Sequence, residues 1–135
     1  DLLVNELAER AGVSAHTVRY YTRVGLLTPR RDPANGYQHY RDDDVGRLRF
    51  IQRAKHLGFT LAEIEAILQD ANEGASPCPR VREIIRQRID ENRRKLDELA
   101  ALQTRMEQAL SQWEDMPDGV PDGHCVCHLI ESLPE

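Results

Sequence analysis

Apolar residues recur at helical spacing along most of the chain, and glycine residues divide this pattern into short segments. Leu3, Leu7 and Ala11 share one helical face, which predicts a first helix that ends at Gly12. Ser14 suits the N-cap of a second helix, because its side chain can accept a hydrogen bond from a free backbone N–H. Two helices joined by a short turn that contains glycine predict a helix-turn-helix.

The stretch after the second helix carries turn signals in place of a periodic pattern. Asn35 and Gly36 form a dipeptide typical of hairpin turns, so residues 26–40 are predicted to form a small wing. Three acidic residues, Asp42–Asp44, suit the first turn of a third helix, since carboxylates are favourable at a helix N-terminus. Thr60 is predicted to cap a fourth helix.

A longer amphipathic pattern follows the predicted loop at residues 73–77. Pro79 suits the first residue of a helix that runs to about Trp113. Its apolar seam advances in alternating steps of four and three: Ile85, Ile89, Asn92, Leu96, Leu99, Gln103, Met106, Leu110 and Trp113. This repeat predicts a coiled coil in which Asn92 and Gln103 fix register and partner number. The alternative is a helix packed on its own domain, for which little chain remains.

Charge is distributed unevenly along the sequence. Residues 1–57 carry ten Lys/Arg against seven Asp/Glu, a net charge of +3, whereas residues 58–135 carry eight against sixteen, a net charge of -8. A basic module joined to an acidic one fits a nucleic-acid-binding protein with a separate control module. Charge alone also fits two modules whose surfaces simply differ.

Composition argues against a membrane protein, and the motifs argue against an enzyme. No apolar stretch approaches the roughly 18 residues of a membrane span and no signal-peptide pattern opens the chain, so a cytoplasmic location is expected. No Gly-rich phosphate loop, Ser/His/Asp arrangement or carboxylate pair suggests catalysis. In a reducing cytosol, an odd number of cysteines, here three, favours ligands, reactive thiols or packing residues over disulfides.

The three cysteines lie at opposite ends of the predicted long helix. Cys78 precedes the helix, and Cys125 and Cys127 follow it. The helix would be about 50 Å long, whereas the segment from Trp113 to Cys127 can span at most roughly 46 Å. One chain cannot comfortably bring Cys78 to its own Cys127, but two antiparallel chains can. This spacing predicts a metal site shared between two protomers, against the alternative of buried, inert thiols.

The second helix and the wing carry the candidate DNA contacts. Exposed positions of the helix are small, hydrogen-bonding or cationic, the types that reach base edges and phosphates in a major groove. Cationic and aromatic residues of the wing suit the flanking phosphate backbone. The predicted contacts are His16, Thr17, Arg19, Tyr20, Arg30, Arg31, Tyr37, His39 and Arg41. The alternative is an ordinary helical hairpin with Tyr20 or Tyr21 in its core.

Short motifs in a fixed order are spread over nearly the whole chain. They are Val4-Asn5-Glu6-Leu7-Ala8, Gly12-Val13-Ser14, Thr17-Val18-Arg19-Tyr20-Tyr21, Gly25-Leu26-Leu27, Gly36-Tyr37, Tyr40, and Gly58-Phe59-Thr60-Leu61 with Ile64. In order and spacing they resemble the MerR family of transcriptional regulators. The resemblance implies a winged helix-turn-helix dimer, joined by an antiparallel coiled coil, on a promoter with an overlong spacer. Ligand binding then bends and twists the DNA so that RNA polymerase can use both promoter elements.

The resemblance also bears on the cysteines. In this family a cysteine just before the long helix, here Cys78, marks sensors of divalent ions, and Cys127 leads into a segment similar to the C-terminal metal loop. Members generally carry another ligand cysteine near the end of the coiled coil, where residues 113–119 have none. Cys125 is the natural substitute, because residues i and i+2 of an extended segment point to the same side. A further departure is Gln38, where many members carry Arg.

Either His124 or His128 could add a nitrogen ligand to the thiolates. Such a donor set suits zinc, cadmium, lead or mercury as the divalent effector. The sequence thus predicts a mainly α fold with three parts: a winged helix-turn-helix domain with two following helices (1–72), a linker and dimerisation helix (73–113), and a metal-binding loop with a short helix (114–135).

The predicted function is that of a homodimeric regulator that binds promoter DNA and, on binding a divalent metal ion, distorts it to activate metal efflux or detoxification genes. RNA polymerase at the promoter is the expected partner. The alternative is a thiol-based redox sensor with the same fold.

Overall fold

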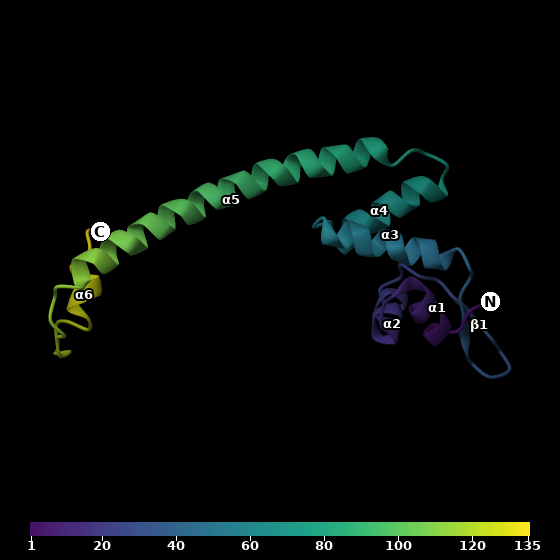
Figure 1. The fold of residues 1–135 in the computed structure, drawn as a ribbon, viewed down its shortest axis with the longest axis horizontal. Coiled ribbons are helices and arrows are strands. Elements are labelled where there is room, and N and C mark those ends of the chain that lie inside the picture. The colour runs from purple at the N-terminus through teal and green to yellow at the C-terminus, as the bar shows by residue number, and fades with distance from the viewer. The chain divides into compact units, whose positions relative to one another are not determined.

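The computed structural model describes residues 1–135, which divide into two compact units, Asp1–Val81 and Arg82–Glu135. The first unit begins with two short helices, α1 (Val4–Ala11) and α2 (Ala15–Arg23), and α1 packs on both α2 and a later helix, α3 (Asp44–His56) (Figure 1). Gly12 ends α1 with a left-handed φ of 74°, a conformation that glycine adopts without strain. Ser14 caps α2 by accepting a hydrogen bond of 3.1 Å from the Thr17 N–H. The predicted helix-turn-helix is confirmed.

The wing is an antiparallel hairpin of β1 (Arg30–Arg31) and β2 (Gln38–His39). Asn35 and Gly36 lie within a longer connection between the strands, closed by a 2.8 Å bond from the Gly36 N–H to the Asp32 carbonyl, and do not form a two-residue turn. Beyond β2, Tyr40 pairs with Leu2 through two backbone hydrogen bonds of 2.7 and 2.8 Å. The base of the wing is therefore tied to the N-terminal end of the chain.

Two further helices, α3 (Asp44–His56) and α4 (Leu61–Asn72), complete the core of the first unit. The side chains of Leu48, Ile51 and Ile64 are fully buried. Of the three consecutive aspartates, only Asp44 lies inside α3, as its first residue. Its carboxylate accepts a hydrogen bond from the Arg41 N–H, just before the helix. Thr60 caps α4 as predicted, in a reciprocal pair of hydrogen bonds with Glu63.

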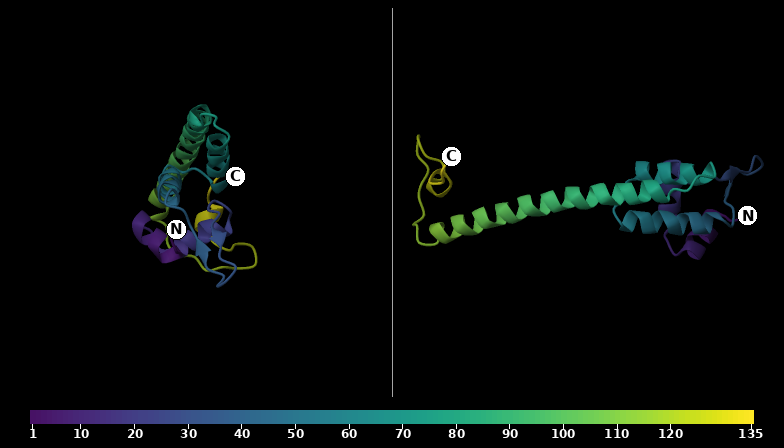
Figure 2. Two further views of the ribbon diagram at one scale, coloured as in Figure 1. Left: turned by 90° about the vertical axis from the view of Figure 1, so that its right-hand side faces the viewer. Right: turned by 90° about the horizontal axis from the view of Figure 1, so that it is seen from above.

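Helix α5 (Cys78–Trp113) has 36 residues and is unbroken and gently curved along its length (Figure 2). It begins one residue earlier than the sequence predicts, since the Val81 N–H already bonds to the Pro77 carbonyl. Pro79 is thus its second residue, where a missing N–H still costs no helical hydrogen bond. Arg80 fastens this first turn to α4 by donating two hydrogen bonds, of 2.7 and 3.2 Å, to the Asp70 carboxylate.

The apolar seam of α5 is open to solvent in the single chain. Ala109 is the one buried residue of α5. The seam residues Ile89, Leu96, Leu99, Met106 and Leu110 are between 50% and 64% exposed. The mainly α class, the winged helix-turn-helix and the long helix are confirmed, whereas the coiled-coil pairing stays a prediction. None of the helices combines the length and apolar character needed to cross a membrane.

Candidate DNA-binding surface and metal-binding loop

Helix α2 has one buried face and one polar, cationic face. Val18 is fully buried and Tyr21 nearly so. His16, Arg19 and Tyr20 are exposed, and His16 lies three residues before Arg19 and four before Tyr20, so they form one stripe along the helix. Arg23 extends this stripe by one turn, and its guanidinium carbon lies 5.6 Å from the centre of the Tyr20 ring. Arg23 was not among the contacts predicted from the sequence, although its spacing of four residues from Arg19 could have indicated it.

Hydrogen bonds fix α2 against the rest of the first unit. The Tyr21 hydroxyl donates to Gln52 of α3 at 3.1 Å, and burial raises the pKa of Tyr21. The Thr22 and Tyr40 hydroxyls are 2.7 Å apart, which joins α2 to the base of the wing. Thr17, a predicted DNA contact, shares its hydroxyl with Ser14 at 2.9 Å and so takes part in the cap. The exposed stripe is therefore held on a rigid support.

Some of the predicted DNA contacts of the wing are free in solvent, and others make contacts within the first unit. Tyr37 is 59% exposed, and Arg41 is also exposed. Arg30 lies 3.1 Å from the Asp1 carboxylate, and Arg31 donates to the Gly36 carbonyl at 3.1 Å. Both guanidinium groups remain largely exposed while they make these contacts with the hairpin or the N-terminal residue.

His39 is the predicted contact that the hairpin covers most. Its Nε2 atom is buried without a hydrogen-bond partner and lies 3.7 Å from the Asp32 carboxylate. This edge of the ring therefore faces the hairpin itself. The sequence could not reveal this, because Asp32 comes opposite His39 only through the longer connection at the tip of the wing.

In the second unit, the segment before α6 (His128–Glu131) is a folded turn that carries two of the three cysteines. The Asp122 carboxylate accepts hydrogen bonds from the His124 and Cys125 N–H groups at 2.7 and 2.8 Å. The Asp122 N–H in turn bonds to the Cys125 carbonyl at 3.0 Å. These hydrogen bonds close the turn at Cys125, the first residue of the Cys-Val-Cys sequence.

Glu131, the last residue of α6, also makes hydrogen bonds to this segment. One of its carboxylate oxygens, Oε2, accepts hydrogen bonds from the Val126 N–H at 2.9 Å, the Cys127 N–H at 2.8 Å and the Cys125 thiol at 2.9 Å. The pKa of the Cys125 thiol is raised, mainly because of the hydrogen bond to Glu131 and secondly because of burial. The same hydrogen bond lowers the pKa of the Glu131 carboxyl. Glu131 was not among the residues predicted from the sequence, although its place four residues after Cys127 could have indicated it.

The two candidate histidine ligands differ in their surroundings. His124 is exposed. The Nε2 atom of His128 lies 2.9 Å from the Pro117 carbonyl. The ring also fills the space beside Gly119, where an added Cβ would come within 2.5 Å of His128 Cδ2. His128 thus closes the loop from residue 117 to 128, and Gly119 is needed for that close approach.

Cys78 lies in the first turn of α5, where its thiol is exposed and its N–H bonds to the Ser76 hydroxyl. All three cysteines are free thiols. Within this single chain, no group of three or more His, Cys, Asp or Glu side chains is placed to hold a metal ion. The structure therefore brings Cys125 and Cys127 onto one turn but completes no three-residue metal site in one chain.

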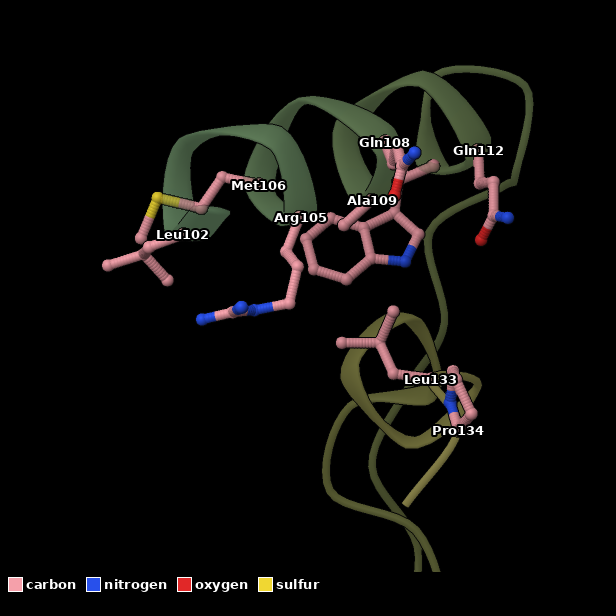
Figure 3. Close-up of a pocket in the computed structure, with 9 residues that line it drawn as sticks. Leu102, Arg105, Met106, Gln108, Ala109, Gln112, Leu133 and Pro134 are labelled. Carbon is pink, nitrogen blue, oxygen red and sulfur yellow. The ribbon is translucent and has the colours of Figure 1, made fainter. Parts of the chain in front are cut away.

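The C-terminal end of the second unit folds back on α5. A groove of about 590 Å³ is lined on one side by Leu133 and Pro134 and on the other by residues of α5 that include Arg105 and Ala109 (Figure 3). Trp113 also lines it, with its indole Nε1 buried and without a hydrogen-bond partner. This contact anchors the end of the segment that carries Cys125 and Cys127.

An exposed cationic stripe on the second helix of a helix-turn-helix, flanked by a wing, defines the class of winged helix-turn-helix DNA-binding proteins. Residues 3–71 match the family described as MerR HTH family regulatory protein, and residues 45–109 match MerR, DNA binding. The chain belongs to the MerR family, whose members are transcriptional regulators and not enzymes.

Individual relatives match this chain over nearly its full length. The HTH-type transcriptional regulator HmrR of Rhizobium leguminosarum bv. viciae is 33% identical over 132 residues, 96% of this chain and 95% of that protein. The mercuric resistance operon regulatory protein of Bacillus cereus matches with the same identity and coverage. The crystal structure of the transcription regulator PbrR691 from Ralstonia metallidurans CH34 in complex with lead(II) has a TM-score of 0.76 at 25% identity, over 99% of this chain and 100% of that one.

Proposed function

We propose that this chain is a metal-responsive transcriptional regulator that binds promoter DNA as a homodimer and activates transcription when it binds a soft or borderline divalent metal ion. The observation that carries the proposal is the turn with two thiols, Cys125 and Cys127, held together by Asp122 and Glu131. Relatives support it by name, since one regulates a mercuric resistance operon and another was crystallised with lead(II). Metal efflux or detoxification genes are the corresponding targets.

The donor chemistry fits this class of effector. Thiolates favour zinc, cadmium, lead or mercury over magnesium or calcium, which prefer oxygen ligands. Cys125 and Cys127 would supply two thiolates, and the exposed Cys78 of the other protomer the third. His124 is the freer of the two candidate nitrogen ligands, because His128 is engaged with Pro117.

The division of the site between protomers follows from the length of α5. Its 36 residues rise about 54 Å at 1.5 Å per residue. In an antiparallel pair, the first turn of one helix lies beside the end of the other. The exposed seam supports such a pair, because a helix with this much apolar surface is expected to bury it against a partner.

In the proposed complex with DNA, α2 lies in the major groove, with Arg19 and Tyr20 towards the base edges. The exposed cations of the wing, with Tyr37, would contact the flanking phosphates. Metal binding would pin the C-terminal loop onto the partner's α5 and so bias the arrangement of the two DNA-binding units. RNA polymerase would then use the distorted promoter.

A mixed dimer tests the shared site. A Cys78→Ser chain is combined with a Cys125→Ser/Cys127→Ser chain, and thiolate-to-metal charge-transfer absorption is followed during titration with cadmium. Each mutant homodimer should lose the signal, whereas the mixed dimer should retain one intact site of two. A mixed dimer without metal binding, or a Cys78→Ser homodimer that responds normally, would contradict the shared site. A transcriptional response to oxidants alone would instead support redox sensing.

A further inference from the structure

We propose that Glu131 is the positioning residue of the metal site: it holds the Cys125-Val126-Cys127 segment in the conformation that presents both thiols, without being a ligand itself. This inference rests on the proposed metal-binding function and adds a residue to it. It comes from the convergence of three hydrogen-bond donors on one carboxylate oxygen.

The backbone contacts are what fix the shape of the segment. The Val126 and Cys127 N–H groups both point at Glu131 Oε2, at 2.9 and 2.8 Å. Two successive peptide groups aimed at one oxygen have their orientations set, and with them the direction in which the Cys127 side chain leaves the backbone. The third bond, from the Cys125 thiol, places that sulfur beside the same oxygen. One acceptor thus relates the two cysteines to each other.

Glu131 reaches these donors because of the short helix α6. The Glu131 N–H bonds to the Cys127 carbonyl at 3.0 Å, so one helical turn stacks residue 131 over residue 127. Its side chain turns back to the free N–H groups that precede the helix, as a glutamate does in a capping box. Apolar packing does not substitute for this contact, because Val126 is 83% exposed. Hydrogen bonds therefore carry the conformation of the segment.

The chemistry of the side chain separates positioning from coordination. Gln retains one carbonyl oxygen that can accept the same N–H bonds, whereas Ala removes the acceptor altogether. If Glu131 acts by positioning, Glu131→Gln should behave like the wild type and Glu131→Ala should not. If the carboxylate were a ligand, both variants should bind the metal more weakly.

The first measurement uses the metal-free, reduced, full-length chain. Backbone hydrogen exchange of Val126 and Cys127, followed by NMR, should be slow in the wild type and in Glu131→Gln, and at least about tenfold faster in Glu131→Ala. Glu114→Ala, which removes an exposed carboxylate earlier in the same unit, serves as the matched control and should leave the exchange unchanged.

The second measurement is a titration with cadmium against a competing chelator, followed by sulfur-to-cadmium absorption. Glu131→Ala should lose about 10- to 100-fold in affinity, the usual range for residues that orient ligands, while Glu131→Gln and Glu114→Ala stay close to the wild type. Unchanged affinity in Glu131→Ala would overturn this role alone. Equal weakening in both Glu131 variants, with a shifted absorption band, would make Glu131 a ligand and also overturn it. A wild type that binds no cadmium would overturn the proposed function together with this role.

Discussion

The two units of the chain obtain their stability in different ways. The first, Asp1–Val81, buries its own apolar side chains, and Leu48, Ile51 and Ile64 are fully covered. The second, Arg82–Glu135, leaves Leu96 and most of its seam exposed. A unit with its own core keeps its shape at any concentration, whereas a unit that buries apolar surface only against a partner depends on protomer concentration. We therefore expect the DNA-reading surface to belong to the monomer and the sensing geometry to the dimer.

The largest effect is expected from charge in the seam. Replacing Leu96 and Leu99 by Glu removes four leucines per dimer, and at about 1.5 to 3 kcal/mol each this costs about 6 to 12 kcal/mol of association energy. Sedimentation equilibrium should find a monomer at concentrations at which the wild type is expected to form a dimer. The control is Leu57→Glu, outside the seam, because Leu57 is 66% exposed and Leu96 is 64% exposed. A dimeric Leu96→Glu/Leu99→Glu protein would show that the seam is not the interface.

The core of the first unit provides the opposite test. Leu48→Ala should lower the free energy of unfolding by about 2 to 5 kcal/mol, because it leaves a cavity where a fully buried side chain stood. Denaturation followed by circular dichroism should give the same loss for this unit at low and high protein concentration. A loss that changes with concentration would mean that the first unit also depends on its partner.

Arg19 tests whether α2 reads the DNA. Arg19→Ala should weaken binding to the specific promoter by about 1 to 3 kcal/mol if the side chain contacts a base. Fluorescence anisotropy at several salt concentrations measures this, with Arg53→Ala on the exposed surface of α3 as the control for loss of one positive charge. Equal losses in both variants would indicate a general effect of charge and contradict the docking of α2.

The smallest effect concerns the junction of α4 and α5. The hydrogen bonds from Arg80 lower the pKa of the Asp70 carboxyl. This contact therefore stabilises the fold above the ordinary Asp pKa of about 4, and the contribution disappears as the pH falls through the lowered value. Asp70→Asn should reduce the melting temperature slightly near pH 7, because the pair is exposed, and should converge with the wild type in strong acid. A difference that persists or grows in acid would contradict this assignment.

Local rules predicted the features that depend on a few neighbouring residues. The caps at Ser14 and Thr60 form as expected, since a side-chain oxygen needs only the N–H three residues away. The wing also lies where Asn35 and Gly36 indicate. Its connection is longer than a two-residue turn, because the closing bond runs from Gly36 back to Asp32.

Features that depend on contacts formed only when the chain folds back on itself could not be predicted. Glu131 is an ordinary acidic residue until α6 turns it back onto Cys125 and Cys127. The covered edge of His39 likewise depends on Asp32 across the hairpin. The cysteines were predicted as metal ligands from the sequence, because their residue types and their separation along the chain already suggest the chemistry; their role as ligands stays a prediction.

Because α5 is one unbroken helix, its length fixes the distance and the rotation between its two ends. Inserting one residue would rotate everything beyond it by about 100° and advance it by about 1.5 Å, which takes the seam out of phase with the end that carries the thiols. Inserting seven residues would restore the phase and lengthen both helices of an antiparallel pair equally, so that each start would still meet the other's end. In the proposed antiparallel dimer, the length of this helix can therefore change in whole heptads, and hardly in any other step, if Cys78 is to stay beside the proposed partner thiol at position 127.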